Sequence, residues 1–203
     1  MKLVIFDFDG VLANTIDLTY KIHVAKNQHF TYEKFKRFAL GNFWEGYDRA
    51  IKDEGHIPPE DFYVNYKKGL DALTIEKILQ DLVSILSQKY NLAIVSSTDS
   101  FYIKEFLEKE NAQKYFSDIL GSDIHRSKTT KIQSLLSKYD LLSRDAIFIT
   151  DTLGDINEAN ECKVRSIGVT WGLHDAPTLK QGNPAKIIDD PRNLILAVEE
   201  MLQ

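Results

Sequence analysis

The chain has 203 residues, 43% of them hydrophobic and 27% charged, and its 25 Lys and Arg against 30 Asp and Glu give a net charge of −5. This length can bury a full core, the acidic balance disfavours nucleic-acid binding, and the single Cys162 excludes a disulfide framework or a Cys-rich zinc site. No apolar run reaches the about 20 residues that cross a bilayer, and the N-terminus does not look like a signal peptide, so we expect a cytoplasmic protein without a membrane partner.

The first predicted element is a strand at Leu3–Phe6, which ends in Asp7-Phe8-Asp9-Gly10. A continuous apolar run of this length is typical of a strand buried on both faces of a parallel sheet. The region that follows shows no strand pattern until about residue 72 and is instead aromatic, with helical spacing. Its breaks fall at glycine and proline, and helices are predicted at 15–27, 31–40, 43–53 and 60–66.

This organisation predicts two domains. A small α-helical domain, residues 13–72, is inserted after the first strand of a core domain formed by residues 1–12 and 73–203.

From residue 75 onward, helices and strands alternate. The helices are predicted at 75–86, 101–110, 132–139, 156–162 and 194–202. The strands are predicted at 92–95, 116–120, 146–149, 164–169 and 186–188. This alternation predicts βα units in a doubly wound, Rossmann-like α/β fold with a parallel sheet. Because the crossovers are right-handed, the carboxyl ends of all strands meet at one edge of the sheet, where ligands bind.

Acidic residues lie where two of these strands end. Asp7 and Asp9 are two positions apart, so both side chains point to one face while the chain stays extended. Buried carboxylates lose hydration and repel each other, and Mg²⁺, which prefers oxygen ligands, would offset both effects. Gly10 lets the backbone turn beside them, and Asp151 ends the strand at 146–149 and so reaches the same edge. A polar turn that ends a strand explains Asp7 and Asp9 equally well if they are considered alone.

Further polar residues lie near strand ends and helix starts. Ser96 ends a strand and, with Ser97, offers hydroxyl and N–H groups to an anion. Lys128 precedes the helix predicted at 132–139 and would hold a substrate anion, with Lys131 as a rival for that role. Asp155 follows Thr152-Leu153-Gly154, which opens the helix whose apolar pattern covers 156–162, and the helix dipole by itself favours an acidic residue in such a first turn.

These motifs, taken in order, resemble the four motifs of the haloacid dehalogenase superfamily. The matching segments are Phe6-Asp7-Phe8-Asp9-Gly10-Val11-Leu12, the strand ending in Ser96, Lys128, and Asp151-Thr-Leu-Gly-Asp155. The position of the helical insert is similar to the subfamily with an α-helical cap, which includes phosphoglycolate phosphatases and β-phosphoglucomutases. The chain departs from the family pattern at Thr150, where glycine is common.

The resemblance implies a Mg²⁺-dependent phosphatase that hydrolyses a small phosphorylated metabolite through an aspartyl-phosphate. Asp7 would be the nucleophile, and Asp9 the general acid and base. The Asp7 carboxylate, the Asp9 carbonyl oxygen and Asp151 would hold Mg²⁺, with Asp155 in support. The phosphate group would bind Ser96, Ser97 and Lys128.

Other functions stay open at this point. One is a phosphomutase of the β-phosphoglucomutase type, and another is a non-catalytic module that senses phosphate. Specificity would come from the helical cap, with Asn42, Trp44 and Tyr47 as candidates, although these side chains could equally pack between cap and core. The sequence leaves open whether the protein is a monomer or a homodimer.

Overall fold

Six parallel strands form one sheet in the computed structural model, which describes residues 1–203. They are β1 (Leu3–Phe6), β2 (Asn91–Val95), β3 (Asp118–Leu120), β4 (Ala146–Thr150), β5 (Arg165–Val169) and β6 (Lys186–Ile188). Their order in the sheet is β3-β2-β1-β4-β5-β6, so the chain winds outward from β1 in both directions. The predicted doubly wound α/β fold is confirmed, and the predicted strands differ from the observed ones by two residues or fewer at their ends.

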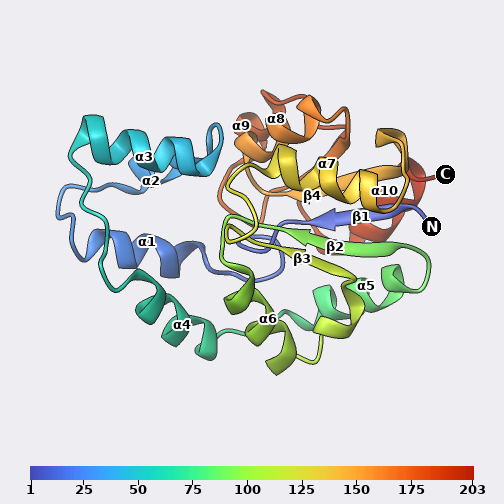
Figure 1. The fold of residues 1–203 in the computed structure, drawn as a ribbon, viewed down its shortest axis with the longest axis horizontal. Helices are drawn as coiled ribbons and strands as arrows, with labels where there is room; N and C mark the ends of the chain where they lie inside the picture. The colour runs from blue at the N-terminus through green and yellow to red at the C-terminus, as the bar shows by residue number, and fades with distance from the viewer.

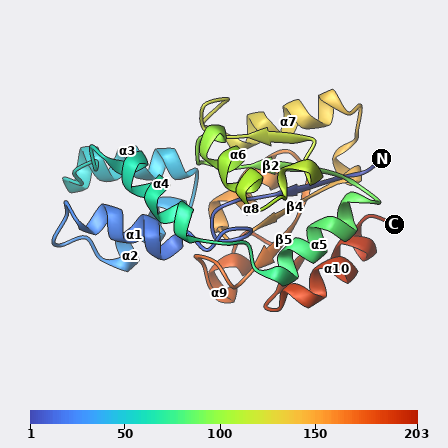
Figure 2. The same cartoon turned by 90° about the horizontal axis from the view of Figure 1, so that it is seen from below.

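Helices cover both faces of the sheet. On one face pack α5 (Lys77–Ser87), α6 (Ser100–Lys109) and α10 (Leu194–Met201), and on the other pack α7 (Lys128–Lys138) and α8 (Leu153–Glu161). Figure 2 shows α7 on one side of the strands and α5 and α10 on the other. The short helix α9 (Ala176–Lys180) follows β5 and contacts β5 and β6.

The central strand β1 shows why its sequence is continuously apolar. Val4 and Phe6 belong to the core cluster on one face, and Leu3 and Ile5 belong to the cluster on the other. All four side chains are buried. Burial of each contributes about 1.5–3 kcal/mol, so a polar residue at any of the four positions would weaken the sheet beside the acidic residues that follow β1.

Four helices and one 3₁₀ helix separate β1 from α5. They are α1 (Ile16–Val24), α2 (Tyr32–Lys36), the 3₁₀ helix η1 (Arg37–Ala39), α3 (Phe43–Glu54) and α4 (Phe62–Ala72). We call them the inserted helices. They lie beyond the carboxyl ends of the strands (Figure 1) and enclose an aromatic cluster of their own around Phe30, Phe35 and Phe38.

Three of the helices predicted in this region differ from the observed ones, and the first, predicted at 15–27, ends at Val24. The helix predicted at 31–40 is divided into α2 and η1, and α4 continues beyond the predicted end at Tyr66 to Ala72. Gly69 does not end α4. A Cβ at Gly69 would lie 2.2 Å from Leu18 Cδ1, so glycine lets α4 approach α1 closely.

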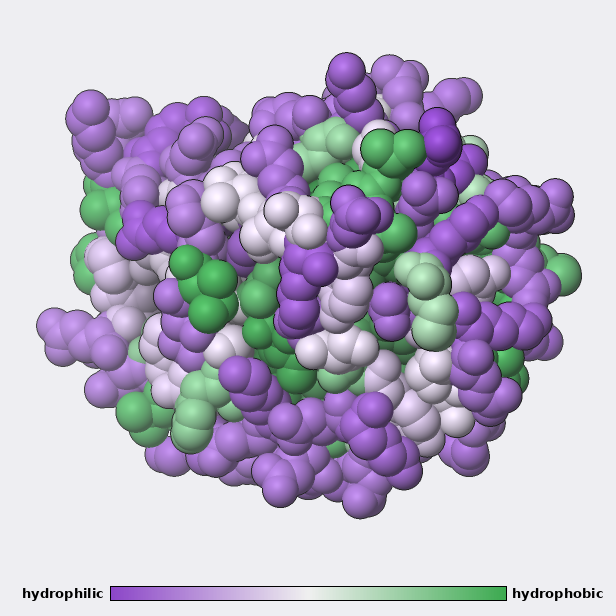
Figure 3. Space-filling view, turned by 45° about the vertical axis from the view of Figure 1, so that its right-hand side comes forward, coloured by the Kyte–Doolittle hydropathy of each residue, from purple (hydrophilic) through white to green (hydrophobic).

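None of the helices combines the length and the apolar composition that a bilayer crossing requires. Hydrophilic side chains cover most of the face drawn in Figure 3, and hydrophobic ones gather toward its centre.

Candidate active site

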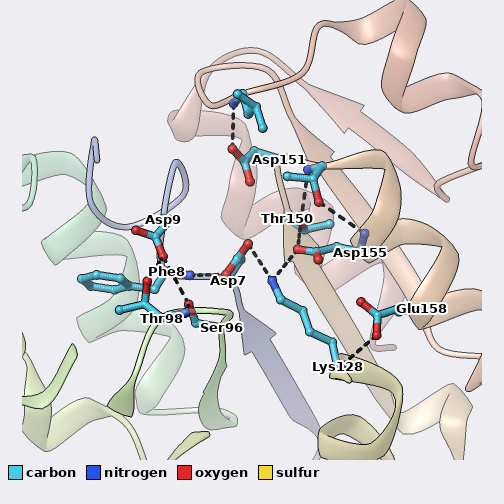
Figure 4. Close-up of polar contacts among 12 residues, drawn as sticks. Asp7, Phe8, Asp9, Ser96, Thr98, Lys128, Thr150, Asp151, Asp155 and Glu158 are labelled. Carbon is cyan, nitrogen blue, oxygen red and sulfur yellow. Dashed lines mark hydrogen bonds and ion pairs between the residues drawn. The ribbon is translucent and has the colours of Figure 1, made fainter. Parts of the chain in front are cut away.

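Asp7, which follows β1, and Asp155 of α8 meet one buried lysine at the carboxyl edge of the sheet, beside Asp151, which follows β4 (Figure 4). The Asp7 carboxylate accepts a hydrogen bond from the Phe8 N–H at 2.7 Å and pairs with Lys128 Nζ at 2.9 Å. The same ammonium group lies 2.7 Å from Asp155 Oδ2. Asp7, Lys128, Asp151 and Asp155 are all buried. The structure therefore brings together four residues that are far apart in the sequence and were predicted to share a site.

Burial and mutual repulsion disfavour the ionised forms of two carboxyl groups at this site. Burial raises the pKa of Asp7 well above its ordinary value, and Asp155 and Asp151 raise it further against the effect of Lys128. Burial also raises the pKa of Asp151 to about 7. The pKa of Asp155 is lowered, because Lys128 and hydrogen bonds outweigh its burial. Only Asp7 and Asp155 pair with the Lys128 ammonium group, and a divalent cation beside Asp7 and Asp151 would favour the ionised forms of these two carboxyl groups.

Asp155 receives a hydrogen bond from the residue at which the chain departs from the family pattern. Thr150 Oγ1 donates to Asp155 Oδ2 at 2.6 Å, and both groups are buried. Together with Lys128, this bond fixes the carboxylate of Asp155. The threonine therefore adds a donor to the site that glycine would not supply.

Lys128 lies in α7, and the predicted start of that helix at residue 132 is wrong. The helix begins at Lys128 after the N-cap Ser127, and the Lys128 N–H donates to Glu158 Oε1 at 2.8 Å. The first turn holds two threonines and no apolar periodicity, so the sequence pattern missed it. The rival Lys131 is directed elsewhere, because its ammonium group donates to the carbonyl oxygens of Ser96 and Gly121.

The residues around Asp151 fit a magnesium ion. Asp151 Oδ2 accepts a hydrogen bond from the Leu173 N–H at 2.7 Å, whereas its Oδ1 is buried and has no hydrogen-bond partner. An unsatisfied buried acceptor costs about 1–3 kcal/mol. A Cβ at Gly10 or Gly172 would lie 2.1 or 2.2 Å from Asp151 Oδ2, so both glycines keep space beside this carboxylate.

The possible donor set is small. The carbonyl oxygen of Asp9 accepts no hydrogen bond, and no group of three or more His, Cys, Asp or Glu side chains is arranged to hold a metal by itself. Mg²⁺ commonly binds through one or two carboxylates, with water and substrate phosphate completing its shell. Asp7, Asp151 and the Asp9 carbonyl oxygen match that description.

The side chain of Asp9 points toward a group of hydroxyls. Its Oδ1 accepts from Thr15 Oγ1 at 2.6 Å and from Tyr66 OH at 2.5 Å. Its Oδ2 accepts from Thr98 Oγ1 at 2.7 Å and from Ser96 Oγ at 3.3 Å. Tyr66 comes from α4, whereas Ser96 and Thr98 follow β2. Asp9 is thus held by both the inserted helices and the core.

A cavity of about 360 Å³ extends from Asp7 and Lys128 into the inserted helices. Ser97 and Thr98 line it, whereas Ser96 is turned toward Asp9 and the Thr98 N–H. Of the residues predicted to bind phosphate, Ser97 and Lys128 therefore line the cavity and Ser96 does not.

Only some of the candidate specificity residues reach the cavity. Trp44 and Tyr47 line the cavity, and Asn42 does not. Asn42 caps α3 by accepting from the N–H groups of Trp44 and Glu45, and its amide donates to Glu158 at 3.0 Å.

Several contacts join the inserted helices to the rest of the protein beside this cavity. Besides the bond between Asn42 and Glu158, the Arg126 guanidinium lies 4.7 Å from the centre of the Trp44 ring and pairs with Asp48 at 3.1 Å. A Cβ at Gly154 would lie 1.8 Å from the Gly41 carbonyl oxygen, so the N-terminus of α8 approaches the inserted segment very closely. These contacts hold the inserted helices against α8 and against the residues just before α7.

The model of the family described as haloacid dehalogenase-like hydrolase matches residues 4–169. The chain belongs to this family. The hydrolase is 24% identical over 211 residues to a phosphoglycolate phosphatase from Synechococcus elongatus, with 100% of both chains covered. It is 26% identical over 208 residues to the pyrophosphatase PpaX from Listeria innocua, covering 97% of this chain and 95% of the relative.

Solved structures show the same fold. A structure described as a predicted phosphatase from Clostridium acetobutylicum aligns with the hydrolase at a TM-score of 0.82 and 23% identity, with 98% of both chains covered. The resemblance drawn from the motifs is therefore confirmed at the level of family and fold.

Sequence reasoning missed part of the site of this hydrolase. Thr98 lies two residues after Ser96, and a search for hydroxyls around the strand end would have found it. Thr15 and Tyr66 carry no such signal, because only the packing of α1 and α4 brings them to Asp9. Glu158 was also missed, and it joins the N-terminus of α7 to Asn42.

Proposed function

We propose that the protein is a Mg²⁺-dependent phosphatase that hydrolyses a small phosphorylated metabolite through an aspartyl-phosphate intermediate. The arrangement at one end of the cavity carries the proposal: Asp7 pairs with Lys128, and Asp151 keeps a buried oxygen without a partner. The family membership and the phosphatase names of two relatives support the same reaction class.

In the proposed reaction, Asp7 attacks the phosphorus of the ester and the bond to the ester oxygen breaks. Asp9 gives its proton to that oxygen and later takes a proton from the water that attacks the aspartyl-phosphate. This second step releases inorganic phosphate and restores the Asp7 carboxylate. Because Asp9 points toward Thr15, Tyr66 and Thr98, we expect its side chain to rotate when a substrate binds.

The phosphate needs positive charge around it, since a carboxylate cannot approach a dianion without compensation. Lys128 supplies one charge, which Asp155 holds in place. Mg²⁺ held by Asp7, Asp151 and the Asp9 carbonyl oxygen would supply the rest. Ser97 would offer its hydroxyl to the phosphoryl oxygens from the β2 side of the cavity.

Residues 13–72 would act as a cap domain over a core formed by residues 1–12 and 73–203. The cavity is lined from both parts, for example by Phe43 and Tyr47 on one side and Asp7 and Lys128 on the other. Closure of such a cap excludes bulk water from the phosphoryl transfer.

The test is hydrolysis of p-nitrophenyl phosphate with Mg²⁺ and with EDTA. We expect EDTA to abolish activity and Asp7→Asn to lower kcat by roughly 1,000-fold or more, because the nucleophile is lost. Asp189→Asn is the matched control, since Asp189 is exposed and makes no ion pair. If the wild type stays inert with Mg²⁺ toward a broad set of phosphate esters, a phosphate-sensing protein is favoured. If it converts one hexose phosphate isomer to another, a phosphomutase is favoured.

A further inference from the structure

The part of the cavity away from Asp7 is lined mainly by aromatic rings, which carry the indole N–H of Trp44 and the hydroxyls of Tyr47 and Tyr63 as their polar groups. Its walls include Phe43, Trp44 and Tyr47 from α3, and Phe62 and Tyr63 from α4. Phe43 and Tyr47 stack at 6.3 Å between ring centroids, and Trp44 meets both rings edge to face. Whatever is attached to the phosphate of a bound substrate must lie against these rings.

The same part of the cavity offers no free cation. Lys128 is the only lysine or arginine among the lining residues, and its ammonium group already pairs with Asp7 and Asp155. Arg126 is near, but it stacks on Trp44 and pairs with Asp48, and it does not line the cavity. The charged side chains that line it next to the aromatic walls are Glu60 and Asp61, and both are exposed and acidic.

These facts decide between classes of substrate. A carboxylate or a second phosphate on the substrate would leave water without gaining a cationic partner, and it would face two acidic residues. An uncharged apolar or aromatic group would instead replace water along the rings with favourable contact. The volume of about 360 Å³ is near the lower end of ligand pockets, which span about 300–1,000 Å³, and suits a phosphate with one ring.

We propose that the substrate is a phosphate monoester of an uncharged apolar or aromatic alcohol, with the phosphate as its only anionic group. This inference rests on the proposed phosphatase function and narrows it. Phosphoglycolate and pyrophosphate, after which two relatives are named, each carry a second anionic group. On this inference the chain differs from those relatives in substrate.

The first experiment compares benzyl phosphate with 4-carboxybenzyl phosphate and with phosphoglycolate, in the presence of Mg²⁺. The two benzyl esters differ by one carboxylate, which isolates the effect of the second charge. We expect kcat/KM for benzyl phosphate to exceed that for either anionic ester by about tenfold or more. Equal values, or a preference for an anionic ester or for phosphocholine, would overturn the inference while leaving the phosphatase function intact.

Binding measurements keep failure of the inference distinguishable from failure of the proposed function, because the preference between ligands can be measured without turnover. We expect calorimetry with Mg²⁺ to give a dissociation constant at least about tenfold lower for benzylphosphonate than for 4-carboxybenzylphosphonate. Equal affinity for the two phosphonates contradicts the inference whatever the activity.

Variants at Phe43 locate the effect in the aromatic wall. We expect Phe43→Ala to lower kcat/KM for benzyl phosphate about tenfold more than it lowers kcat/KM for methyl phosphate, which does not reach the ring. We expect Phe43→Arg to shift the preference toward 4-carboxybenzyl phosphate by supplying the missing cation. Phe101→Ala is the matched control, because Phe101 lies on α6, is 55% exposed and does not line the cavity. Unchanged substrate ratios in both Phe43 variants would exclude the aromatic wall as the source of specificity.

Discussion

Several residues at this site make hydrogen bonds that their local sequence does not predict. Asp9 collects four hydroxyl donors, and Tyr66 reaches it from a helix 57 positions later in the chain. Burial, followed by the negative charge of Asp9, raises the pKa of the Tyr66 hydroxyl well above its ordinary value, so this group stays a donor at any physiological pH. A hydrogen bond from a buried hydroxyl to a carboxylate stabilises the fold more than one between neutral groups.

Removal of that hydroxyl should therefore destabilise the protein. We expect Tyr66→Phe to lower the free energy of unfolding in urea by about 1.5 kcal/mol, since the ring and its stacking on Phe62 are kept while one donor to Asp9 is lost. Tyr115→Phe serves as the control, because the Tyr115 hydroxyl makes no hydrogen bond to another residue. A loss no larger than that of the control would show that Asp9 is held without Tyr66.

Two glycines have the same left-handed backbone conformation, but only one of them lies at the site. Alanine substitutions at the two positions can therefore distinguish the effect of backbone strain from the effect of a clash in the site. Gly10 has φ +73° and Gly55 has φ +68°. Alanine at either position costs about 1 kcal/mol or more of backbone strain. Only at Gly10 would the new Cβ also meet Asp151, whereas at Gly55 nothing lies within 4 Å. We expect Gly10→Ala to abolish hydrolysis and weaken Mg²⁺ binding by calorimetry, and Gly55→Ala to keep both. Equal loss in the two variants would contradict a role for the space beside Asp151.

At the scale of elements, contacts at the N-termini of α3 and α7 position the residues of the site. The helix α7 begins at Lys128 because Ser127 caps it and Glu158 of α8 accepts from its first N–H. The helix α3 begins at Phe43 because Asn42 caps it, and the same asparagine donates to Glu158. One buried glutamate thus connects the start of the lysine-bearing helix to the start of the helix that carries the aromatic wall.

Asn42 caps α3 and also donates a hydrogen bond to Glu158, and variants of Asn42 can distinguish these two roles. Asn42→Ser keeps a capping oxygen and loses the amide that reaches Glu158, whereas Asn42→Ala loses both. We expect Asn42→Ala to lower the free energy of unfolding by about 1 kcal/mol relative to Asn42→Ser. We expect both variants to raise KM for p-nitrophenyl phosphate, because α3 loses its bond to the core. A KM that stays at the wild-type value in Asn42→Ser would show that Glu158 does not help to position α3.

At the scale of the molecule, the inserted helices have a core that depends on neutral histidines. His23 Nδ1 lies 3.1 Å from His56 Nε2, and both rings are packed among Phe30, Phe38 and Tyr47. Burial lowers the pKa of His23 to about 3, with His56 adding to the effect, and burial also lowers the pKa of His56. A proton on either ring would place an unpartnered charge inside an aromatic cluster.

Stability should therefore fall in acid. The folded pKa of His23 lies below its unfolded value of about 6.5, so the unfolded chain binds more protons and stability is lost as pH falls from about 6.5 toward 3. We expect the free energy of unfolding to drop in this window by up to about 1.4 kcal/mol per pH unit for this group. Unfolding by urea at several pH values should show a shallower slope in His23→Leu and an unchanged slope in His29→Leu, since His29 is exposed. An identical slope in wild type and His23→Leu would exclude His23 as the cause.

The sequence by itself determined the sheet and the acidic residues at its edge. Apolar runs such as Leu3–Phe6 are local signals, and parallel strands must end at one edge, so Asp7 and Asp151 could be placed together without coordinates. Only the tertiary structure decided which groups surround Asp9, where α7 begins, and that Trp44 and Tyr47 line the cavity while Asn42 binds Glu158. Most of these features depend on contacts between residues that lie tens of positions apart, and such contacts leave no periodic pattern in the chain. For the same reason, the aromatic cavity without a free cation became visible only once the inserted helices were packed over the sheet.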